Sequence, residues 1–416
     1  MPPEPHPHFS GWRVCAFAAL TQALAIGFTL GAVGLFAGPM GAEFGIGATA
    51  FNVGVGGFTC VMNLSMPLIG RVVDRGSIRG VMSIGALVLA ASLIGLSFAQ
   101  SAWQVGVLWI FGCALGMAML GPMPSSTAMA NWFDRFRGRA LGTANAGAPI
   151  GPFIIVPLAG LVLESWGWRP ILLVFAAACV VIALPASRFG MIDRPQDVGQ
   201  RADGDDAIES DDAAPAAALE EEVWEAPAIL RSVDFWCLAI GAALFGAQGI
   251  IVGANVIPFL QHRGASVELS AVAPMAMGVG AIAGPLVFGP LADRIHPRTL
   301  FVGLCLVVAL AFGALTADLS MPVLLGLLLV CGLAGGSMMP VYGALIARLF
   351  GVASFGQVMG LAALVAIPTG TLAPIAFGYA IDQTDSYTTS FVGLIAAMAV
   401  SVAFFLALSR TAARRR

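Results

Sequence analysis

The amino-acid sequence predicts an all-α membrane protein in which twelve transmembrane helices form two parallel repeats of six. Its 416 residues are 58% hydrophobic and only 10% charged, whereas a soluble domain carries about 25% charged residues. The mean hydropathy is +0.90, and a chain this apolar cannot cover itself with polar surface in water. A short charged turn in the first half of the chain also recurs in the second half.

Twelve apolar runs are each long enough to cross about 30 Å of hydrocarbon, which takes roughly 20 residues of helix. We expect the membrane-spanning helices, in chain order, at residues 12–38, 50–70, 80–99, 102–130, 139–163, 170–189, 232–260, 268–291, 299–317, 321–348, 355–380 and 388–409. The first run is too long to be the apolar core of a cleavable signal peptide, so we expect it to span the membrane.

A polar segment separates the sixth apolar run from the seventh. Residues 191–230 hold twelve of the 23 acidic residues and only two arginines, Arg194 and Arg201. Low hydrophobicity and a run of like charge are typical of a flexible linker. The chain therefore divides into an N-terminal six-helix half (residues 1–190), an acidic cytoplasmic linker (191–230) and a C-terminal six-helix half (231–416).

The arginines predict how the helices are oriented in the membrane. The chain has 20 arginines and lysines, and all of them are arginine. If both termini lie in the cytoplasm, only Arg169 and Arg263 fall on the other side, which leaves 18 of the 20 inside. Because cytoplasmic loops carry an excess of basic residues, we expect a multi-pass protein of the bacterial inner (plasma) membrane with both termini in the cytoplasm.

The two halves of the chain have related sequences. Three residues at the end of the second run and just after it recur 219 positions later: Gly70, Asp74 and Arg75 correspond to Gly289, Asp293 and Arg294. Pro122 in the fourth run corresponds in the same way to Pro340 in the tenth, at a distance of 218. Each half contains an even number of runs, so both copies cross the membrane in the same direction. Parallel repeats of this kind place a substrate site between the halves, near the middle of the bilayer.

Two stretches resemble the signatures of a known transporter family. GRVVDRGSIRG (residues 70–80) resembles the loop between the second and third helices of the major facilitator superfamily, and the resemblance of the fold covers the whole chain. WFDRFRGRALGTANAG (132–147) is similar to the fifth-helix signature of monocarboxylate-porter and oxalate–formate antiporter-like transporters. FSGWRV (9–14) is similar in part to the first-helix motif of that group, but lacks its acidic residue. The resemblance implies alternating access and a small carboxylate as the solute.

The charged turn and its second copy supply the residues that we predict to control gating. These are Gly70, Asp74, Arg75 and Arg79 in the first copy and Gly289, Asp293, Arg294 and Arg298 in the second. Glycine permits a tight turn, Asp74 can sit at the positive N-terminus of a neighbouring helix, and the arginines can pair with carboxylates or with carbonyls at helix C-termini. We expect these contacts to join the halves on the cytoplasmic side while the site opens outward. The alternative is a short basic loop that only sets the topology.

Neutral polar residues are the candidates for binding the substrate, because no acidic or basic residue lies in the middle of a predicted span. Relatives of the monocarboxylate-porter type commonly carry a buried cation or an acid–base pair, and this chain departs from that pattern. The candidates are Gln22, Thr29, Asn63, Asn145, Gln248, Asn255 and Tyr342. Gln22 and Thr29 share one helix face about 10 Å apart, and Gln248 and Asn255 repeat this spacing. Each buried amide needs a partner, which is either a small polar substrate or a neighbouring helix.

These features favour a secondary transporter for a small organic solute, by resemblance a small carboxylate, that works by facilitated diffusion, exchange or symport with a proton. A second hypothesis is efflux of a neutral or lipophilic compound, since Met338 and Met339 suit an adaptable apolar pocket. A third is a membrane receptor that transports nothing.

Other classes of function are not expected. We find no nucleophile–base set and no phosphate-binding loop, so an enzyme is not predicted. The seven cysteines lie singly and the four histidines form no cluster with them, so no metal or other cofactor is predicted. The expected partners are the substrate, with or without a proton, and the lipid bilayer, but not nucleic acid. We expect a monomer.

Overall fold

The structure is a computed structural model that describes residues 9–46, 48–204, 223–270, 272–384 and 386–408. Within these ranges, all regular secondary structure is helical. Twelve helical segments are long and apolar enough to span a membrane. The predicted all-α fold class and the predicted number of spans are therefore confirmed.

The first half of the chain contains six spans, three of which include π-helical turns. They are α1 (Gly11–Ile26) with η1 (Gly27–Gly31) and α2 (Val33–Phe44); α3 (Ala48–Arg75); α4 (Ile78–Ser97); α5 (Ala102–Val107) with η2 (Leu108–Cys113), α6 (Ala114–Leu120) and α7 (Pro122–Trp132); α8 (Arg137–Trp166); and α9 (Trp168–Ala178) with η3 (Cys179–Ala183) and η4 (Ala186–Gly190). In the fourth span, Pro122 begins α7, a position where the missing N–H of proline breaks no helical hydrogen bond.

The second half contains six more spans, each made of one continuous helix. They are α11 (Val233–His262), α13 (Val272–Arg294), α14 (Pro297–Leu315), α15 (Met321–Phe350), α16 (Phe355–Thr384) and α17 (Tyr387–Ala407). Shorter helices lie between the spans: η5 (Pro195–Val198), η6 (Ala202–Gly204), α10 (Ala226–Arg231) and α12 (Val267–Ser270).

The third span of each half begins with a side-chain cap. The hydroxyl of Ser77 accepts a hydrogen bond from the N–H of Gly80 at the start of α4, over 3.0 Å. The Nδ1 atom of His296 accepts one from the N–H of Arg298 at the start of α14, over 3.2 Å. The first N–H groups of a helix have no partner inside it, and these two side chains supply one. The caps therefore fix the starts of α4 and α14 at equivalent positions of the repeat.

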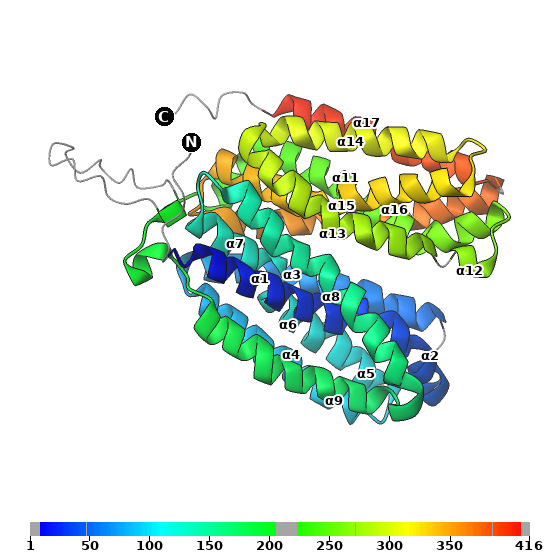
Figure 1. The fold of residues 1–416 in the computed structure, drawn as a ribbon, viewed down its shortest axis with the longest axis horizontal. Coiled ribbons are helices and arrows are strands. Elements are labelled where there is room, and N and C mark those ends of the chain that lie inside the picture. The colour runs from blue at the N-terminus through cyan, green and yellow to red at the C-terminus, as the bar shows by residue number, and fades with distance from the viewer. Residues whose placement is uncertain (1–8, 47, 205–222, 271, 385, 409–416) are drawn as a thin grey trace.

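The spans form two bundles, one from each half of the chain. Figure 1 shows α1 to α9 together in the lower bundle and α11 to α17 in the upper one. Across the boundary, α8 packs along α13 and α3 packs along α16. The helices α3 and α13 are the second spans of their halves, and α8 and α16 are the fifth spans. The two contacts between the bundles are therefore equivalent under the repeat.

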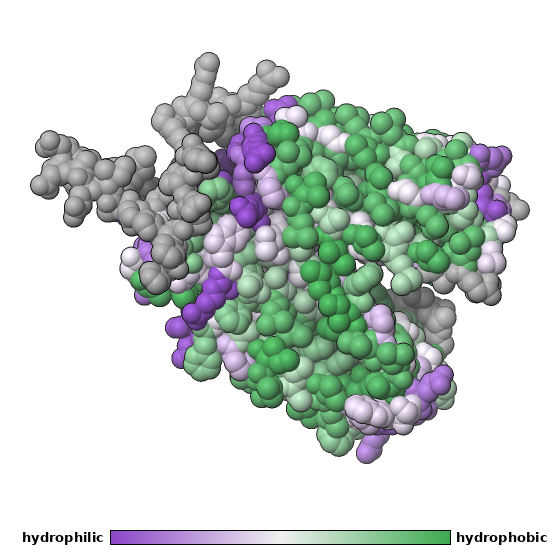
Figure 2. Space-filling view, in the orientation of Figure 1, coloured by the Kyte–Doolittle hydropathy of each residue, from purple (hydrophilic) through white to green (hydrophobic). Residues whose placement is uncertain are grey.

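A broad apolar surface surrounds the bundles. Figure 2 shows hydrophobic residues along the length of the spans and hydrophilic residues gathered at the two ends. Large apolar side chains such as Leu68, Val181 and Leu310 are 68%, 70% and 74% exposed, a pattern that is costly in water and favourable in lipid. The chain is an integral, multi-pass membrane protein.

The bundles pack closely at one end, and α3 and α16 separate toward the other, whereas α13 still meets α8 where Gly278 faces the ring of Phe153. We call the end with the turns 70–80 and 289–298 the charged end. There, a Cβ atom on Gly70 would overlap the carbonyl oxygen of Gly356 on α16, and a Cβ on Gly360 would lie 2.6 Å from the carbonyl oxygen of Met66. Further along the same pair of helices, a Cβ on Gly54 or Gly378 would meet no described atom within 4 Å. Figure 2 shows the matching hollow between the bundles at the opposite end.

Candidate functional site

Asp74 links the two halves at the charged end. It lies near the end of α3, and its carboxylate accepts hydrogen bonds from the N–H groups of Gly356 (2.9 Å) and Gln357 (2.7 Å). Both N–H groups belong to the first turn of α16, where they have no partner within the helix and where the helix dipole favours negative charge. Gly70, one turn before Asp74, lets the two backbones approach closely enough for this contact.

Asp293 makes the equivalent contact from the second half. It lies near the end of α13, and its carboxylate accepts from the N–H groups of Gly138 (2.5 Å) and Arg139 (2.9 Å) in the first turn of α8. A Cβ on Gly289 would lie 2.6 Å from the carbonyl oxygen of Gly138. The two halves are therefore joined by a pair of carboxylates, each bound to the N-terminus of a helix in the other half.

The predicted gating arginines have different surroundings. The guanidinium of Arg298 donates to the carbonyl oxygens of Leu408 (3.0 Å) and Leu406 at the end of α17, where carbonyls lack helical partners. The backbone N–H of Arg79 donates to a carboxylate oxygen of Asp193 over 2.7 Å. The side chains of Arg75 and Arg294 are exposed at the charged end.

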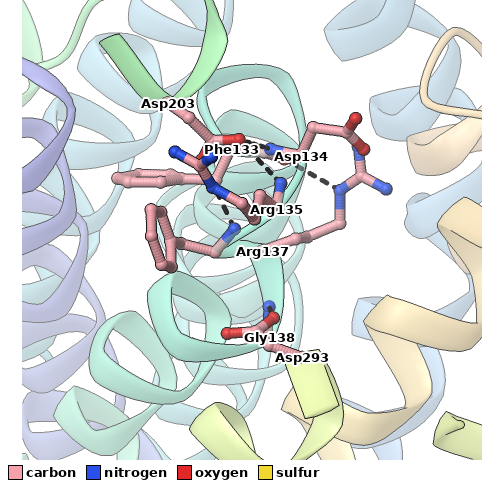
Figure 3. Close-up of polar contacts among 8 residues, drawn as sticks. Phe133, Asp134, Arg135, Arg137, Gly138, Asp203 and Asp293 are labelled. Atoms are coloured by element: carbon pink, nitrogen blue, oxygen red, sulfur yellow. Dashed lines mark hydrogen bonds and ion pairs between the residues drawn. The ribbon is translucent and has the colours of Figure 1, made fainter. Parts of the chain in front are cut away.

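A third carboxylate, Asp203, binds the turn that leads into α8. It accepts from the N–H groups of Asp134 (3.1 Å), Arg135 (2.6 Å) and Phe136 (3.4 Å). Figure 3 shows Asp203 and Asp293 on opposite sides of this turn. Five backbone N–H groups within residues 134–139 are thus bound by two carboxylates, one from the linker and one from the second half of the chain.

Asp203 is not among the site residues predicted from the sequence. It is 6% exposed, and at φ 61° it is the only non-glycine residue of the described ranges with a positive φ. Such a conformation is uncommon outside glycine and is tolerated by aspartate. The neighbouring pair Asp203 and Gly204 is a turn signal, but the partner of that turn lies about 70 residues earlier in the chain and leaves no local pattern.

The linker was expected to be flexible, but its described parts are folded against both halves. The indole N–H of Trp132 donates to the carbonyl oxygen of Ile192 over 2.8 Å. On the other side, the N–H of Trp224 donates to the hydroxyl of Ser354 over 2.7 Å, beside the first turn of α16. The tryptophan ring packs edge-on against Phe350, with ring centroids 5.5 Å apart. These tertiary contacts compensate for the low hydrophobicity of the segment.

In the first half, the predicted binding residues lie between packed helices. Gln22 is fully buried, and its Nε2 atom donates to the carbonyl oxygen of Ala144 over 3.1 Å. The Nδ2 atom of Asn145 donates to the carbonyl oxygen of Leu141 (2.8 Å) and to the hydroxyl of Ser126 (3.2 Å). The amide oxygens of Gln22 and Asn145 are buried without a described partner.

Thr29 lies in the π-helical turn η1 of the first span and is completely buried. Its hydroxyl donates to the carbonyl oxygen of Ala25 (2.5 Å) and contacts the sulfur of Met117 (3.2 Å). Asn63 lies in α3 and is half-buried. The described contacts of the Thr29 hydroxyl therefore lie within the first half, with the preceding helical turn and with α6.

In the second half, Gln248 lines a cavity. The cavity has a volume of about 280 Å³ and lies between α11, α13 and α15. Gln248 is 1% exposed, and its Oε1 atom has no partner among the described residues. The Nδ2 atom of Asn255 donates to the carbonyl oxygen of Ile251 in its own helix over 2.8 Å. Tyr342 is 5% exposed in α15 and is not part of the cavity wall.

At the opposite end, the described ion pairs stay within one half. The guanidinium of Arg169 pairs with Glu43 at 2.5 Å and also donates to the carbonyl oxygen of Ala99. The guanidinium of Arg263 pairs with Asp318 at 2.6 Å and also donates to the carbonyl oxygen of Leu315. These contacts hold loops of one bundle together and do not join the bundles at this end.

A comparison with models of known protein families agrees with the fold and the charged turns described above. The model of the Major Facilitator Superfamily matches residues 17–365 and, in a second match, residues 238–416. The chain belongs to the major facilitator superfamily. The family resemblance predicted from residues 70–80 and 132–147 is confirmed, and the chain is a transporter rather than an enzyme.

Several relatives are named as transporters. Monocarboxylate transporter 12 of Rattus norvegicus is 26% identical over 358 residues, which cover 80% of this chain and 72% of the relative. Monocarboxylate transporter 11 of Homo sapiens is 26% identical over 413 residues, covering 92% and 79%. The uncharacterized MFS-type transporter YcxA of Bacillus subtilis is 23% identical over 360 residues, covering 84% and 83%.

Solved structures share the fold over nearly the whole chain. A double-tryptophan variant of XylE has a TM-score of 0.77 at 14% identity, covering 96% of this chain and 95% of that chain. The human organic anion transporter MFSD10 (TETRAN) has a TM-score of 0.69 at 17% identity, covering 95% and 99%. At these identities the likeness establishes the fold alone.

Proposed function

We propose that this transporter moves a small carboxylate across the membrane by alternating access, with its charged end in the cytoplasm. The distribution of arginines supports the orientation, because 18 of the 20 lie on the side of the charged end by the arrangement of the spans. The names of the monocarboxylate transporters among its relatives support the substrate class.

The observation that carries the proposal is the pair of carboxylate contacts at one end only. The carboxylates of Asp74 and Asp293 join the halves at the charged end, while α3 and α16 separate toward the opposite end. This is the shape of a transporter that is open to the outside. Opening toward the cytoplasm requires both contacts to break together, because each helix of the pairs α3–α16 and α8–α13 belongs to a different rigid bundle.

The remaining gating residues support these contacts in different ways. Gly70 and Gly289 allow the close approach of the backbones. Arg298 fixes the start of α14 against the end of α17. For Arg75, Arg79 and Arg294 we propose a role in orientation, since exposed guanidinium groups at the ends of spans favour the cytoplasmic side.

Buried amides on both halves are the proposed binding groups. Gln22 and Asn145 in the first half and Gln248 in the second each have an oxygen without a described partner. Thr29, Asn63, Asn255 and Tyr342 are proposed to shape the surrounding helices, since the described hydrogen bonds of Thr29 and Asn255 are to neighbouring protein atoms. In this arrangement, the halves exchange contacts with the substrate as they rock around it.

Uptake into proteoliposomes tests the proposal. Purified transporter would be given labelled lactate, pyruvate, oxalate and formate, with and without an inward proton gradient. Saturable uptake of at least one acid above that of protein-free vesicles is expected. Absence of uptake by folded protein would contradict the substrate class.

The alternative, efflux of a neutral or lipophilic compound, is favoured by one observation. The cavity beside Gln248 is lined by Phe245, Met277, Cys331 and Met338 together with several glycines, and such a wall accommodates varied apolar shapes. If no acid is transported, displacement of a fluorescent lipophilic compound from the purified protein would distinguish this function.

A further inference from the structure

A basic cavity lies between the two halves at the charged end. Its volume is about 590 Å³, and its wall comes from α13 and from α8 with the turn before it. Figure 1 shows these two helices side by side at the boundary between the bundles. The first half contributes Arg135 and Arg139 to the wall, and the second half contributes Leu286, Pro290, Asp293 and Arg294. Three guanidinium groups and one carboxylate leave two net positive charges, so the cavity attracts an anion.

The carboxylate of Asp293 is already bound by backbone groups. Its oxygens accept hydrogen bonds from the N–H groups of Gly138 (2.5 Å) and Arg139 (2.9 Å) in the first turn of α8. The guanidinium of Arg139 stacks over the ring of Trp12 on α1, with its central carbon 5.0 Å from the ring centroid. Stacking uses the face of a guanidinium, whereas its N–H donors lie in its plane. Neither contact therefore uses the donors of the Arg139 side chain, which lines the cavity.

The repeat shows that a gating contact does not need this group of arginines. At the equivalent contact between α3 and α16, Arg75 corresponds to Arg294. The positions of the two arginines from the first half, however, are occupied there by Ala353 and Gln357. Arginines from both halves around one cavity are thus a feature of the contact between α8 and α13 and not of the repeat, so their role differs from gating.

The wall of the cavity also extends along the apolar part of α13. Leu286, Pro290 and Arg294 are four residues apart, so they lie on one face of the helix over about 12 Å. Leu286 and its neighbour Val287 are 47% and 53% exposed and belong to the apolar surface around the bundles. The cavity therefore runs from this apolar surface to the charged end. A phospholipid has the same order of groups, acyl chains followed by a phosphate, whereas a soluble phosphate would contact the arginines alone.

We propose that this cavity binds the phosphate of one anionic phospholipid, with Arg135 and Arg139 of one half and Arg294 of the other around it. Arginine suits this role because its planar guanidinium can donate two parallel hydrogen bonds to phosphate oxygens. Basic pockets between transmembrane helices on the cytoplasmic side are sites for such headgroups. The lipid joins the two halves beside the Asp293 contact and stabilises the state that is closed at the charged end. The inference goes beyond the proposed function, because it concerns a lipid and not the transported acid.

Native mass spectrometry of the full-length protein in detergent tests the site without any transport. Purified protein would be titrated with dioleoylphosphatidylglycerol, and the Kd of the first bound lipid would be measured. Arg139→Gln and Arg294→Gln should each weaken binding about fivefold, and the double variant about 25-fold. Arg75→Gln is the matched control, because it removes the same charge at the equivalent position of the other contact, and its Kd should not change.

The outcome of this titration decides the proposal. Unchanged binding in both variants, or equal weakening by Arg75→Gln, would overturn it. Weakening by Arg139→Gln alone would also contradict it, since the headgroup would then contact only one half. Arg139→Lys keeps the positive charge and should bind the lipid better than Arg139→Gln. If both substitutions weaken binding equally, the charge of this residue is not what holds the lipid.

Two further compounds identify the source of the phosphate. Dioleoylphosphatidylcholine has the same acyl chains, but its quaternary ammonium makes the headgroup neutral overall, so it should bind more weakly. Glycerol 1-phosphate supplies the headgroup without the chains, and in large excess it should not displace the lipid. Displacement would assign the cavity to a soluble phosphate, and equal binding of the two lipids would assign it to acyl chains alone; either result overturns the proposal. Failure of every acid to be transported would contradict the proposed function and leave this site intact.

Discussion

Replacing Asp74 with asparagine should favour the state that is open at the charged end. The carboxylate accepts two N–H groups of α16, at 2.9 and 2.7 Å, and hydrogen bonds to a charged group contribute about 1.5–3 kcal/mol each. Asparagine keeps one acceptor oxygen but turns its NH₂ group toward the second N–H and has no charge at the helix N-terminus. A loss of about 2 kcal/mol, or roughly a 30-fold shift of the equilibrium, is expected.

Labelling of a covered cysteine measures this shift. Ala292 is 2% exposed on α13, where it lies against Gly138 of the other half, so a cysteine there becomes reactive only when the charged end opens. On a background without the seven native cysteines, Ala292→Cys should react with a maleimide much faster when combined with Asp74→Asn. Asp134→Asn is the control, because that side chain is 69% exposed at the same end.

The symmetry of the repeat predicts the effect of a second substitution in the same labelling assay. Asp293→Asn should accelerate labelling about as much as Asp74→Asn, because both carboxylates bind two N–H groups at a helix N-terminus. The double variant should approach the sum of the two free-energy changes, about 4 kcal/mol, since the contacts lie on separate helix pairs. Equal labelling rates in all three variants and the wild type would refute the gating role of both residues.

Four further predictions concern other parts of the molecule. Asp203→Ala should accelerate the labelling of Ala292→Cys, because the turn 134–136 loses its acceptor; an unchanged labelling rate would contradict this account. Gly70→Ala should open the charged end, since its Cβ overlaps the carbonyl oxygen of Gly356, and Gly54→Ala should not. Gln22→Ala combined with Gln248→Ala should weaken the affinity for the acid more than either change alone, and unaltered affinity would assign both amides to helix packing. Partial desolvation of the His296 ring, which stays exposed, followed by the charges of Arg348 and Arg298, lowers its pKa, so the neutral ring that caps α14 is favoured in the folded state. Stability should fall as the pH drops below the ordinary histidine value of 6.5, and His296→Asn should remove this loss in a thermal unfolding assay.

Much of the fold could be predicted because a run of about 20 apolar residues is long enough to form a transmembrane helix. The errors lie at the ends of the spans. The first span was expected to end at residue 38, but the helix continues to Phe44. The carboxylate of Glu43 in this extension binds the indole N–H of Trp168 (3.0 Å) and the guanidinium of Arg169. A charged residue ends an apolar pattern, but a partner distant in sequence can keep it in a helix.

The candidate site was less predictable for the same reason. The sequence indicates that Gln22 needs a partner, but the carbonyl oxygen of Ala144 becomes that partner only because α1 and α8 approach closely at Gly147. Asp203 resembles the other acidic residues of its segment, and its role in the turn before α8 follows from tertiary contacts alone. Asp74 and Asp293 could be predicted because the same short charged pattern occurs in both halves of the chain, so each copy points to the other.

Simultaneous distances at both ends of the molecule test alternating access most directly. Spin labels would be placed on exposed residues of the two halves, at Phe189 and Ile295 for the charged end and at Trp103 and Val323 for the opposite end. Pulsed electron paramagnetic resonance would then be recorded with and without a transported acid. The account predicts that the acid lengthens the first distance and shortens the second. A change at one end only, or in the same direction at both ends, would contradict it.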